Sequence, residues 1–273
     1  MKKVLFLFLC LISILNASAL HNKIADIIGY NEYNKNKNII TVLFQDENKF
    51  LAGGELNVVA VLEELRKNGL LKLRFVDPQD FTLEFRTNDL SLNSVYIIKS
   101  VLNSMGYQYY FIQNIEKNSK ENFLKISIVL NTEYKVDPIL LSRELNKNQV
   151  RILDITKKDN EAWIYKIDMK NAMASDALFV ATDEKISLPK PLKPYLIQID
   201  RASEINIASK KLDNWFPYIV FYDDKLNPLY VIEKQDTFSG IKSAVPAGTK
   251  YIQIGDLYNL VNIKRGLTLV IKG

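Results

Sequence analysis

The chain has 273 residues, with 36 Lys and Arg against 31 Asp and Glu, and a formal net charge of +5 at pH 7. Basic and acidic residues are interspersed and form no basic stripe or face, which argues against nucleic acid as a partner. The single cysteine, Cys10, and the single histidine, His21, both lie near the N-terminus. The body of the chain therefore lacks the residues for a disulfide, a cysteine metal site or a serine–histidine pair.

The N-terminus has the pattern of a secretory signal peptide, predicted to span residues 1–19. Lys2 and Lys3 precede an uncharged apolar run, residues 4–15, and small residues follow at 17–19, where a signal peptidase cuts. The apolar run is shorter than the roughly 20 residues that cross a bilayer, so an uncleaved anchor is the less favoured alternative.

Cleavage of this signal would place the mature protein in the bacterial periplasm. A lipoprotein attached through Cys10 is a second alternative, disfavoured because Leu9 stands where a small residue is expected. No later segment reaches spanning length without charges, so we expect no membrane span after signal cleavage.

Residues 20–53 are predicted to be a mobile lead-in that contains one strand. Residues 31–38, NEYNKNKN, are polar and have little to bury. Residues 39–45, IITVLFQ, are expected to form the strand. His21 is expected on a loose terminus, away from any structured site.

Residues 54–170 are predicted to form an α+β region of two or three helix–hairpin (αββ) units. Each unit begins with apolar residues at helical spacing and continues with two stretches of alternating residues. The helices are expected at residues 56–69, 91–106 and 137–149. In the first unit, DPQD at 77–80 is expected to turn the chain between strands 70–76 and 81–87.

The three units align on equally spaced anchors at the end of each helix. Two apolar residues one turn apart hold the helix on a sheet, and a helix stop follows four residues later. The anchors are Val61, Leu65 and Gly69; Ile98, Leu102 and Gly106; and Leu141, Leu145 and Gln149. A diverged repeat would explain the equal spacing of these anchors. The alternative is that each is an ordinary α+β junction, and Gln149 in place of the glycine weakens the third copy of the repeat.

The helix–glycine–aromatic junction SVLNSMGYQYYFI, within residues 54–169, resembles the small ring-building modules of secretins and flagellar accessory proteins in bacterial envelopes. No invariant polar motif carries the resemblance. It implies a role in assembly rather than in catalysis.

Residues 171–194 are predicted to be an extended linker, because Pro189, Pro191 and Pro194 follow one another closely. Residues 195–273 then read as short alternating strands separated by turns, which predicts an all-β sandwich. The segment VPAGTKYIQIGDLYN resembles the late strands of jelly-roll and carbohydrate-binding sandwiches, in which a Pro-Ala-Gly turn precedes a strand that ends near an aspartate.

The sequence offers no catalytic, cofactor-binding or metal-binding candidate. Lys99 and Ser100 are adjacent helix positions that do not face each other, so a Ser-Lys hydrolase is a remote alternative. Asp223 and Asp224 lie in a turn, where neighbouring carboxylates point apart and lack calcium-loop spacing.

Aromatic residues are the remaining candidates for contact with a protein interface or a glycan. Tyr107, Tyr109 and Phe111 are expected on one face of a strand; with Tyr107 in the core, Tyr110 is the side chain expected to be exposed. In the C-terminal domain the candidates are Trp215, Tyr218 and Tyr222. A core position for each is the alternative.

Together these features predict a non-enzymatic periplasmic scaffold or accessory subunit in a secretion or flagellar motor-associated assembly. The expected partners are other periplasmic or envelope proteins, with self-association as a further expectation, and no cofactor is expected. The alternative is a glycan- or peptidoglycan-binding protein that acts through the C-terminal sandwich.

Overall fold

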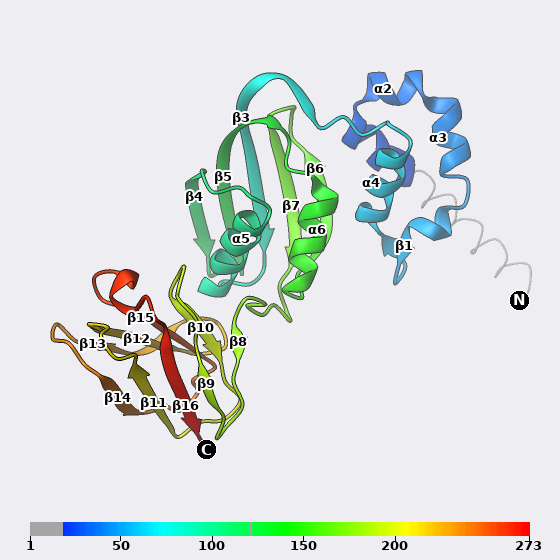
Figure 1. The fold of residues 1–273 in the computed structure, drawn as a ribbon. Helices are drawn as coiled ribbons and strands as arrows, with labels where there is room; N and C mark the ends of the chain where they lie inside the picture. The colour runs from blue at the N-terminus through cyan, green and yellow to red at the C-terminus, as the bar shows by residue number, and fades with distance from the viewer. Residues whose placement is uncertain (1–18, 121) are drawn as a thin grey trace, which may run out of the picture. The chain divides into compact units, whose positions relative to one another are not determined.

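The computed structural model describes residues 19–120 and 122–273, so the predicted signal peptide falls, up to residue 18, outside the described residues. The chain divides into two compact units (Figure 1). Unit 1 comprises residues up to 90 and 97–172, and unit 2 comprises residues 91–96 and 173–273. Within the described ranges, no helix is both long and apolar enough to cross a bilayer. The structure is of mixed α and β type, with most of its regular elements being strands.

Unit 1 begins with helices rather than with the predicted lead-in and strand. Residues 19–28 are helical, and α2 (Tyr30–Lys35) and α3 (Lys37–Leu43) follow. The expected strand at 39–45 is wrong: Ile40 and Phe44, one turn apart, are both buried, a helical spacing that outweighs the β-branched composition. His21 is also not loose, because its Nδ1 lies 2.9 Å from the Tyr33 hydroxyl.

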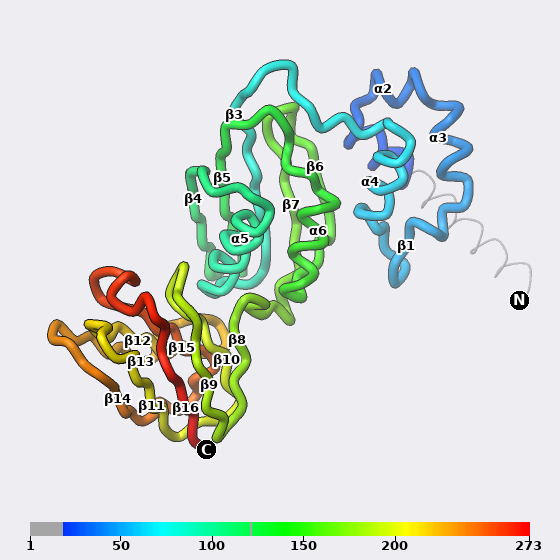
Figure 2. Tube along the Cα trace, in the orientation of Figure 1, coloured from blue at the N-terminus to red at the C-terminus, as the bar shows by residue number. Residues whose placement is uncertain are grey.

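The main part of unit 1 is a five-stranded sheet in the order β4-β5-β3-β7-β6, with α5 and α6 lying over one face (Figures 1 and 2). Its buried face is apolar and includes Phe81, Leu83 and Phe85 of the central strand. The other elements up to residue 172 are η1 (Glu47–Phe50), β1 (Leu51–Ala52), β2 (Glu55–Leu56), α4 (Val58–Lys67), β3 (Arg74–Thr87), α5 (Leu92–Ser104), β4 (Phe111–Asn118), β5 (Phe123–Tyr134), α6 (Pro138–Lys147), β6 (Arg151–Lys157) and β7 (Ala162–Asp168). The start of α5, up to residue 96, is counted with unit 2 and the rest with unit 1.

The first predicted hairpin is absent, because residues 74–87 form the single strand β3. Its pairing with β5 is interrupted between Arg74 and Gln79 and then continues to Thr87. Pro78 has no N–H to donate to a ladder, so the turn-like sequence produces an irregularity in one strand instead of a reversal. The later helices α5 and α6 are each followed by an antiparallel pair, β4–β5 and β6–β7. This element order does not establish three αββ repeats.

The three predicted helix stops share one backbone geometry. Gly69, Gly106 and Gln149 all have positive φ, at 70°, 91° and 56°. In each case the next N–H reaches back to the predicted apolar anchor: Leu70 to the Leu65 carbonyl at 2.8 Å, Tyr107 to Leu102 at 3.0 Å and Val150 to Leu145 at 3.1 Å. This bond is that of a Schellman-type helix end. Gln149 therefore performs the same local turn despite its side chain.

We expect Gly106→Ala to destabilise unit 1 by about 1 kcal/mol, because an L-residue resists a left-handed φ. The added Cβ would meet nothing within 4 Å, so the whole cost is in the backbone. The chain has two tryptophans, and Trp163 lies in unit 1. Its indole N–H signal in ¹H–¹⁵N spectra, followed through a urea titration, measures the change. Asn103→Ala, at an exposed position of α5, should stay within about 0.5 kcal/mol of the parent; equal effects of both changes would contradict the prediction.

Unit 2 is a β-sandwich of two sheets that enclose one apolar core. The sheets run in the orders β13-β12-β15-β10-β8 and β14-β11-β16-β9. Side chains of both sheets, including Phe221 and Leu269, are fully buried in the core, as is Trp215 just before β12. The elements are β8 (Leu178–Phe179), β9 (Lys185–Ser187), β10 (Tyr195–Gln198), β11 (Glu204–Ser209), β12 (Pro217–Tyr222), β13 (Pro228–Glu233), β14 (Gly240–Ala244), β15 (Tyr251–Asp256), η2 (Leu260–Ile263) and β16 (Leu267–Lys272).

The segment predicted as a linker, residues 171–194, contributes to this sandwich. β8 pairs in parallel with β10, and β9 pairs with β16. Val180 and Leu188 from the same segment are buried in the core. The sandwich therefore begins well before residue 195, and the prolines lie in the connection from β9 to β10.

Candidate functional site

Strand β4 is an edge strand that exposes apolar side chains. It pairs with β5 on one side, and no strand within the described ranges pairs with its other side. Phe111 is 79% exposed, Ile112 37% and Ile115 47%. Edge strands of natural proteins are usually short, charged or covered, because an open row of N–H and C=O groups invites another strand. An uncovered apolar edge is therefore a candidate for protein contact.

The register with β5 sets the face of each β4 side chain. Ile112 and Ile115 oppose Ile128 and Ile126, whose buried side chains lie on the helix-covered face. Phe111 opposes Val129 and so lies on the opposite face. Apolar groups are thus available on both faces along the same open edge.

A break in regularity at the start of β4 determines which aromatics are exposed. Residues 107–110 belong to no strand, so the expected alternation does not apply to them. A second irregularity lies between Ile112 and Asn114. Tyr109 is 93% exposed, whereas Tyr110 is half-buried, and burial raises the pKa of the Tyr110 hydroxyl. The expectation that Tyr110 is the exposed residue is therefore corrected in favour of its neighbours.

The opposite edge of the same sheet, β6, is covered. Lys23 from the first helical segment donates to the Ile155 carbonyl at 3.3 Å and pairs with Asp154 at 2.8 Å. This contact occupies part of the β6 backbone and places charge beside it, both of which oppose strand addition. No such contact covers β4 among the described residues. The sheet therefore has one covered edge, β6, with which the open edge β4 can be compared.

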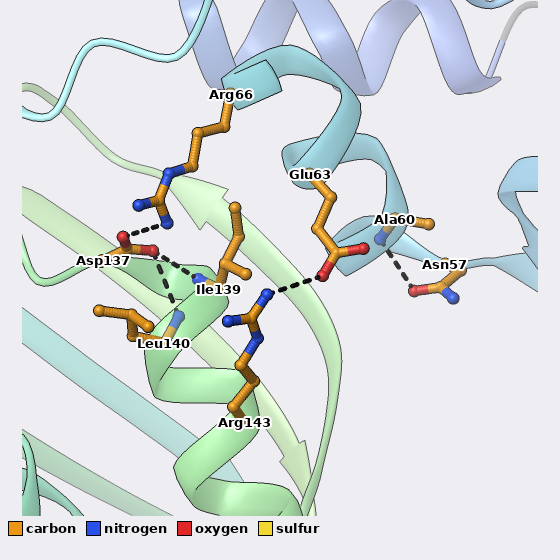
Figure 3. A network of polar contacts seen from close by, with 8 residues as sticks. All are labelled: Asn57, Ala60, Glu63, Arg66, Asp137, Ile139, Leu140 and Arg143. Carbon is orange, nitrogen blue, oxygen red and sulfur yellow. Dashed lines mark hydrogen bonds and ion pairs between the residues drawn. The ribbon is translucent and has the colours of Figure 1, made fainter.

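The helices α4 and α6 are joined by a polar network (Figure 3). The Asp137 carboxylate accepts from the Ile139 and Leu140 N–H groups at 2.9 and 3.2 Å and pairs with Arg66. Arg143 lies 3.9 Å from Glu63. A surface hollow of about 470 Å³ lies between these side chains. Exposed pairs of this kind contribute little to stability, and the charges largely satisfy one another.

The sandwich candidates occupy three different environments. Trp215 is buried at 0% exposure, and its Nε1 donates to the Gly255 carbonyl at 2.8 Å. The indole is thus part of the core, which removes Trp215 as an exposed contact residue. Tyr222 packs against an apolar cluster on the outside of its sheet, and burial raises the pKa of its hydroxyl. Tyr218 is half-buried and lies on the same side of β12 as Tyr222, because both alternate along the strand with the core-facing Ile219 and Phe221.

The predicted contact residues are not brought together as a group. Tyr110 belongs to unit 1, whereas Trp215, Tyr218 and Tyr222 belong to unit 2. The residues that sequence reasoning missed are Tyr109 and Phe111, which it had assigned to the same face as Tyr107. Residues 107–110 after the glycine stop belong to no strand, so Tyr107 and Tyr109 do not share a strand face with Phe111, which begins β4.

The acidic pair predicted to be a solvated turn has that role at Asp223. Its carboxylate accepts from the N–H groups of Lys225 and Asn227 at 2.9 and 2.8 Å and from the Asn227 amide at 2.9 Å. Burial raises the pKa of Asp223, but these hydrogen bonds outweigh it and hold the pKa below its usual value. In the part of the chain that the structure describes, no three His, Cys, Asp or Glu side chains gather as metal ligands do.

No protein-family model matches this sequence, and no curated protein matches it. Among solved structures, the chain is similar to the pre-peptidase C-terminal domain of collagenase from Bacillus anthracis, with 17% sequence identity and a TM-score of 0.27. The alignment covers 35% of this chain and 94% of that one. A similarity this slight carries no argument about function.

Proposed function

We propose that this protein is a non-enzymatic assembly protein of the bacterial envelope that pairs with a second copy of itself through β4. The observation that carries the proposal is the open apolar edge formed by Phe111, Ile112 and Ile115. Adding a strand there would satisfy the free backbone groups and remove apolar surface from water in one step.

The sequence of β4 is complementary to itself in the antiparallel sense. When two copies pair about a two-fold axis centred between Gln113 and Asn114, Ile112 opposes Ile115 of the second copy, and the reverse contact repeats it. Both isoleucines lie on the helix-covered face, so the pair forms one apolar cluster. Phe111 opposes Glu116 in this register, and no like charges face each other.

A second apolar edge remains for a different envelope protein. β13 is the last strand of its sheet in unit 2, and Leu229, Tyr230 and Val231 are 43%, 53% and 42% exposed. A β4-linked dimer would present two copies of this edge, and two linked contacts bind far more tightly than one. This arrangement fits the accessory or scaffold role, and the signal pattern at residues 1–19 supports a periplasmic location.

The likeness of SVLNSMGYQYYFI to ring-building modules supports assembly as well, since the same junction leads directly into β4. The glycan-binding alternative has less support. Of the aromatics predicted for it, Trp215 is in the core and Tyr222 packs against an apolar cluster, although Tyr230 and Tyr258 of the sandwich are exposed.

The test is the molar mass of the purified protein by light scattering over a range of concentrations. We expect a dimer whose dissociation constant rises at least about tenfold in Ile112→Lys, because a lysine on the edge opposes strand addition. Leu153→Lys on β6 is the matched control, since Leu153 is 38% and Ile112 37% exposed. It should leave the dimer unchanged, as should Val231→Lys on β13. A monomer at all concentrations, or equal loss in Ile112→Lys and Leu153→Lys, would refute pairing through β4.

A further inference from the structure

A second feature of unit 1 is a hollow on a different part of the sheet, close to the β6–β7 turn. Its volume is about 230 Å³, below the range of sites for drug-sized ligands. The lining comes from the first helical segment, the connection from α4 to β3, the end of β5 and the β6–β7 hairpin. The lining residues are Ile27, Ile28, Glu32, Leu70, Leu71, Lys72, Lys135, Lys157, Asn160 and Trp163.

The hollow carries an excess of positive charge. Lys72 pairs with Glu32 at 3.0 Å, which accounts for the one acidic side chain in the lining. Lys135 is buried at 9% exposure, and no ion pair joins it or Lys157 to a carboxylate of the described residues. The Lys135 ammonium instead lies 5.1 Å from the centroid of the Phe75 ring. Two lysines of the lining, Lys135 and Lys157, thus bring positive charge to the hollow that no ion pair neutralises among the described residues.

A buried donor in the lining also lacks an acceptor. Trp163 is 1% exposed, and its indole Nε1 has no hydrogen-bond partner among the described residues. The other tryptophan, Trp215, meets the ordinary expectation by donating to Gly255. Unpaired buried donors are rare in folded proteins and call for an explanation, such as a ligand or an ordered water.

We propose that this hollow binds a small monocarboxylate with a short apolar chain, its oxygens held by Lys135, Lys157 and the Trp163 N–H. The carboxylate would satisfy both the uncompensated charge and the unpaired donor. The walls supplied by Ile27, Ile28, Leu70 and Leu71 would contact the apolar part. These apolar walls favour an organic acid over inorganic phosphate, whose surface is polar on every side.

The electrostatics of the two lysines agree with an anion site. Burial lowers the pKa of Lys135, and the neighbouring charge of Lys157 lowers it further. Burial also lowers the pKa of Lys157, although Asp159 opposes this effect. An anion between the two ammonium groups would reverse their repulsion and favour the charged forms.

The two indole N–H signals of the full ¹⁵N-labelled chain provide the test, with sodium butyrate as the probe. We expect the Trp163 signal to shift and saturate, whereas the Trp215 signal stays in place because its N–H is already bonded inside unit 2. Trp163→Phe assigns the two signals. Sodium chloride at the same ionic strength and 1-butanol at the same concentration should leave the Trp163 signal unmoved.

Lys135→Gln and Lys157→Gln should each weaken butyrate binding by about tenfold, the scale of one charged hydrogen bond. Lys158→Gln makes the same charge change at an exposed neighbouring position and should leave the affinity within about twofold. A single sharp Trp163 signal before butyrate is added shows that unit 1 is folded in each variant, and Lys157→Gln tests the site if Lys135→Gln fails to fold. No saturable shift with butyrate, an equal shift with butanol, or saturation by inorganic phosphate alone would overturn the proposal.

Discussion

Replacing Gly266 by alanine is expected to destabilise the sandwich by about 3 kcal/mol or more, the sum of a backbone cost and a steric one. Gly266 has a φ of 81°, in the left-handed region. A Cβ built there would lie 2.0 Å from the Leu188 carbonyl oxygen and 2.9 Å from that of Pro189. Both are backbone atoms, so no side-chain rotation can relieve the overlap.

The neighbouring hydrogen bonds prevent the backbone from moving away. The Leu188 N–H donates to the Leu267 carbonyl at 2.8 Å, next to Gly266, and the Gly266 N–H donates to Ile263 at 2.8 Å. Separating the two segments would break the first of these bonds and open the core around the buried Leu188 and Leu267. The glycine is therefore required by close packing as well as by φ.

Gly248→Ala is the matched control, because Gly248 has nearly the same φ, 84°, but nothing within 4 Å of its added Cβ. It should cost about 1 kcal/mol, the backbone part alone. Urea titrations followed through the Trp215 indole signal measure both variants within unit 2. Equal destabilisation by the two changes would show that the Leu188 contact does not matter.

Local features of the fold could be predicted from the sequence where neighbours along the chain decide them. The stops at Gly69, Gly106 and Gln149 follow from helical spacing and a left-handed residue, and all three adopt positive φ. The Asp137 cap of α6 is similarly local, since its carboxylate accepts from Ile139 and Leu140. The sandwich followed from strand periodicity, and the Pro-Ala-Gly segment makes a turn in which Thr249 donates to Pro246.

Features that depend on distant segments could not be predicted. Whether Phe111 is exposed depends on β4 lying at the edge of its sheet, which the local alternation does not reveal. From the sequence, Trp215 is a candidate contact residue with a core position as the alternative, and only the sheets of unit 2, which enclose it, decide between the two. The hollow around Lys135 is assembled from segments that lie far apart in the sequence, so no motif marks it.

The second large effect is expected at Asp256, where Asp256→Ala should destabilise unit 2 by about 3 kcal/mol because it removes several charge-assisted hydrogen bonds. One carboxylate oxygen accepts from the Phe216 N–H at 2.8 Å, which ties the end of β15 to the start of β12. The other accepts from Tyr258, Asn259 and the Asn262 amide at 3.0, 2.9 and 3.0 Å. A single side chain thus joins β12, β15 and the turn into η2.

The loss of stability should depend on how far apart in the sequence the bonded segments lie, not on the number of hydrogen bonds. Asp223 also accepts several hydrogen bonds, but all come from residues no more than four positions away. Asp223→Ala should therefore cost about 1 kcal/mol, the usual value for a local turn or cap. The free-energy cost of Asp256→Asn should lie between those of Asp256→Ala and Asp223→Ala, because asparagine keeps one acceptor oxygen and loses the other. Urea titrations read at Trp215 give this order directly; an equal cost for Asp256→Ala and Asp223→Ala would mean that the link to Phe216 adds nothing to the sandwich.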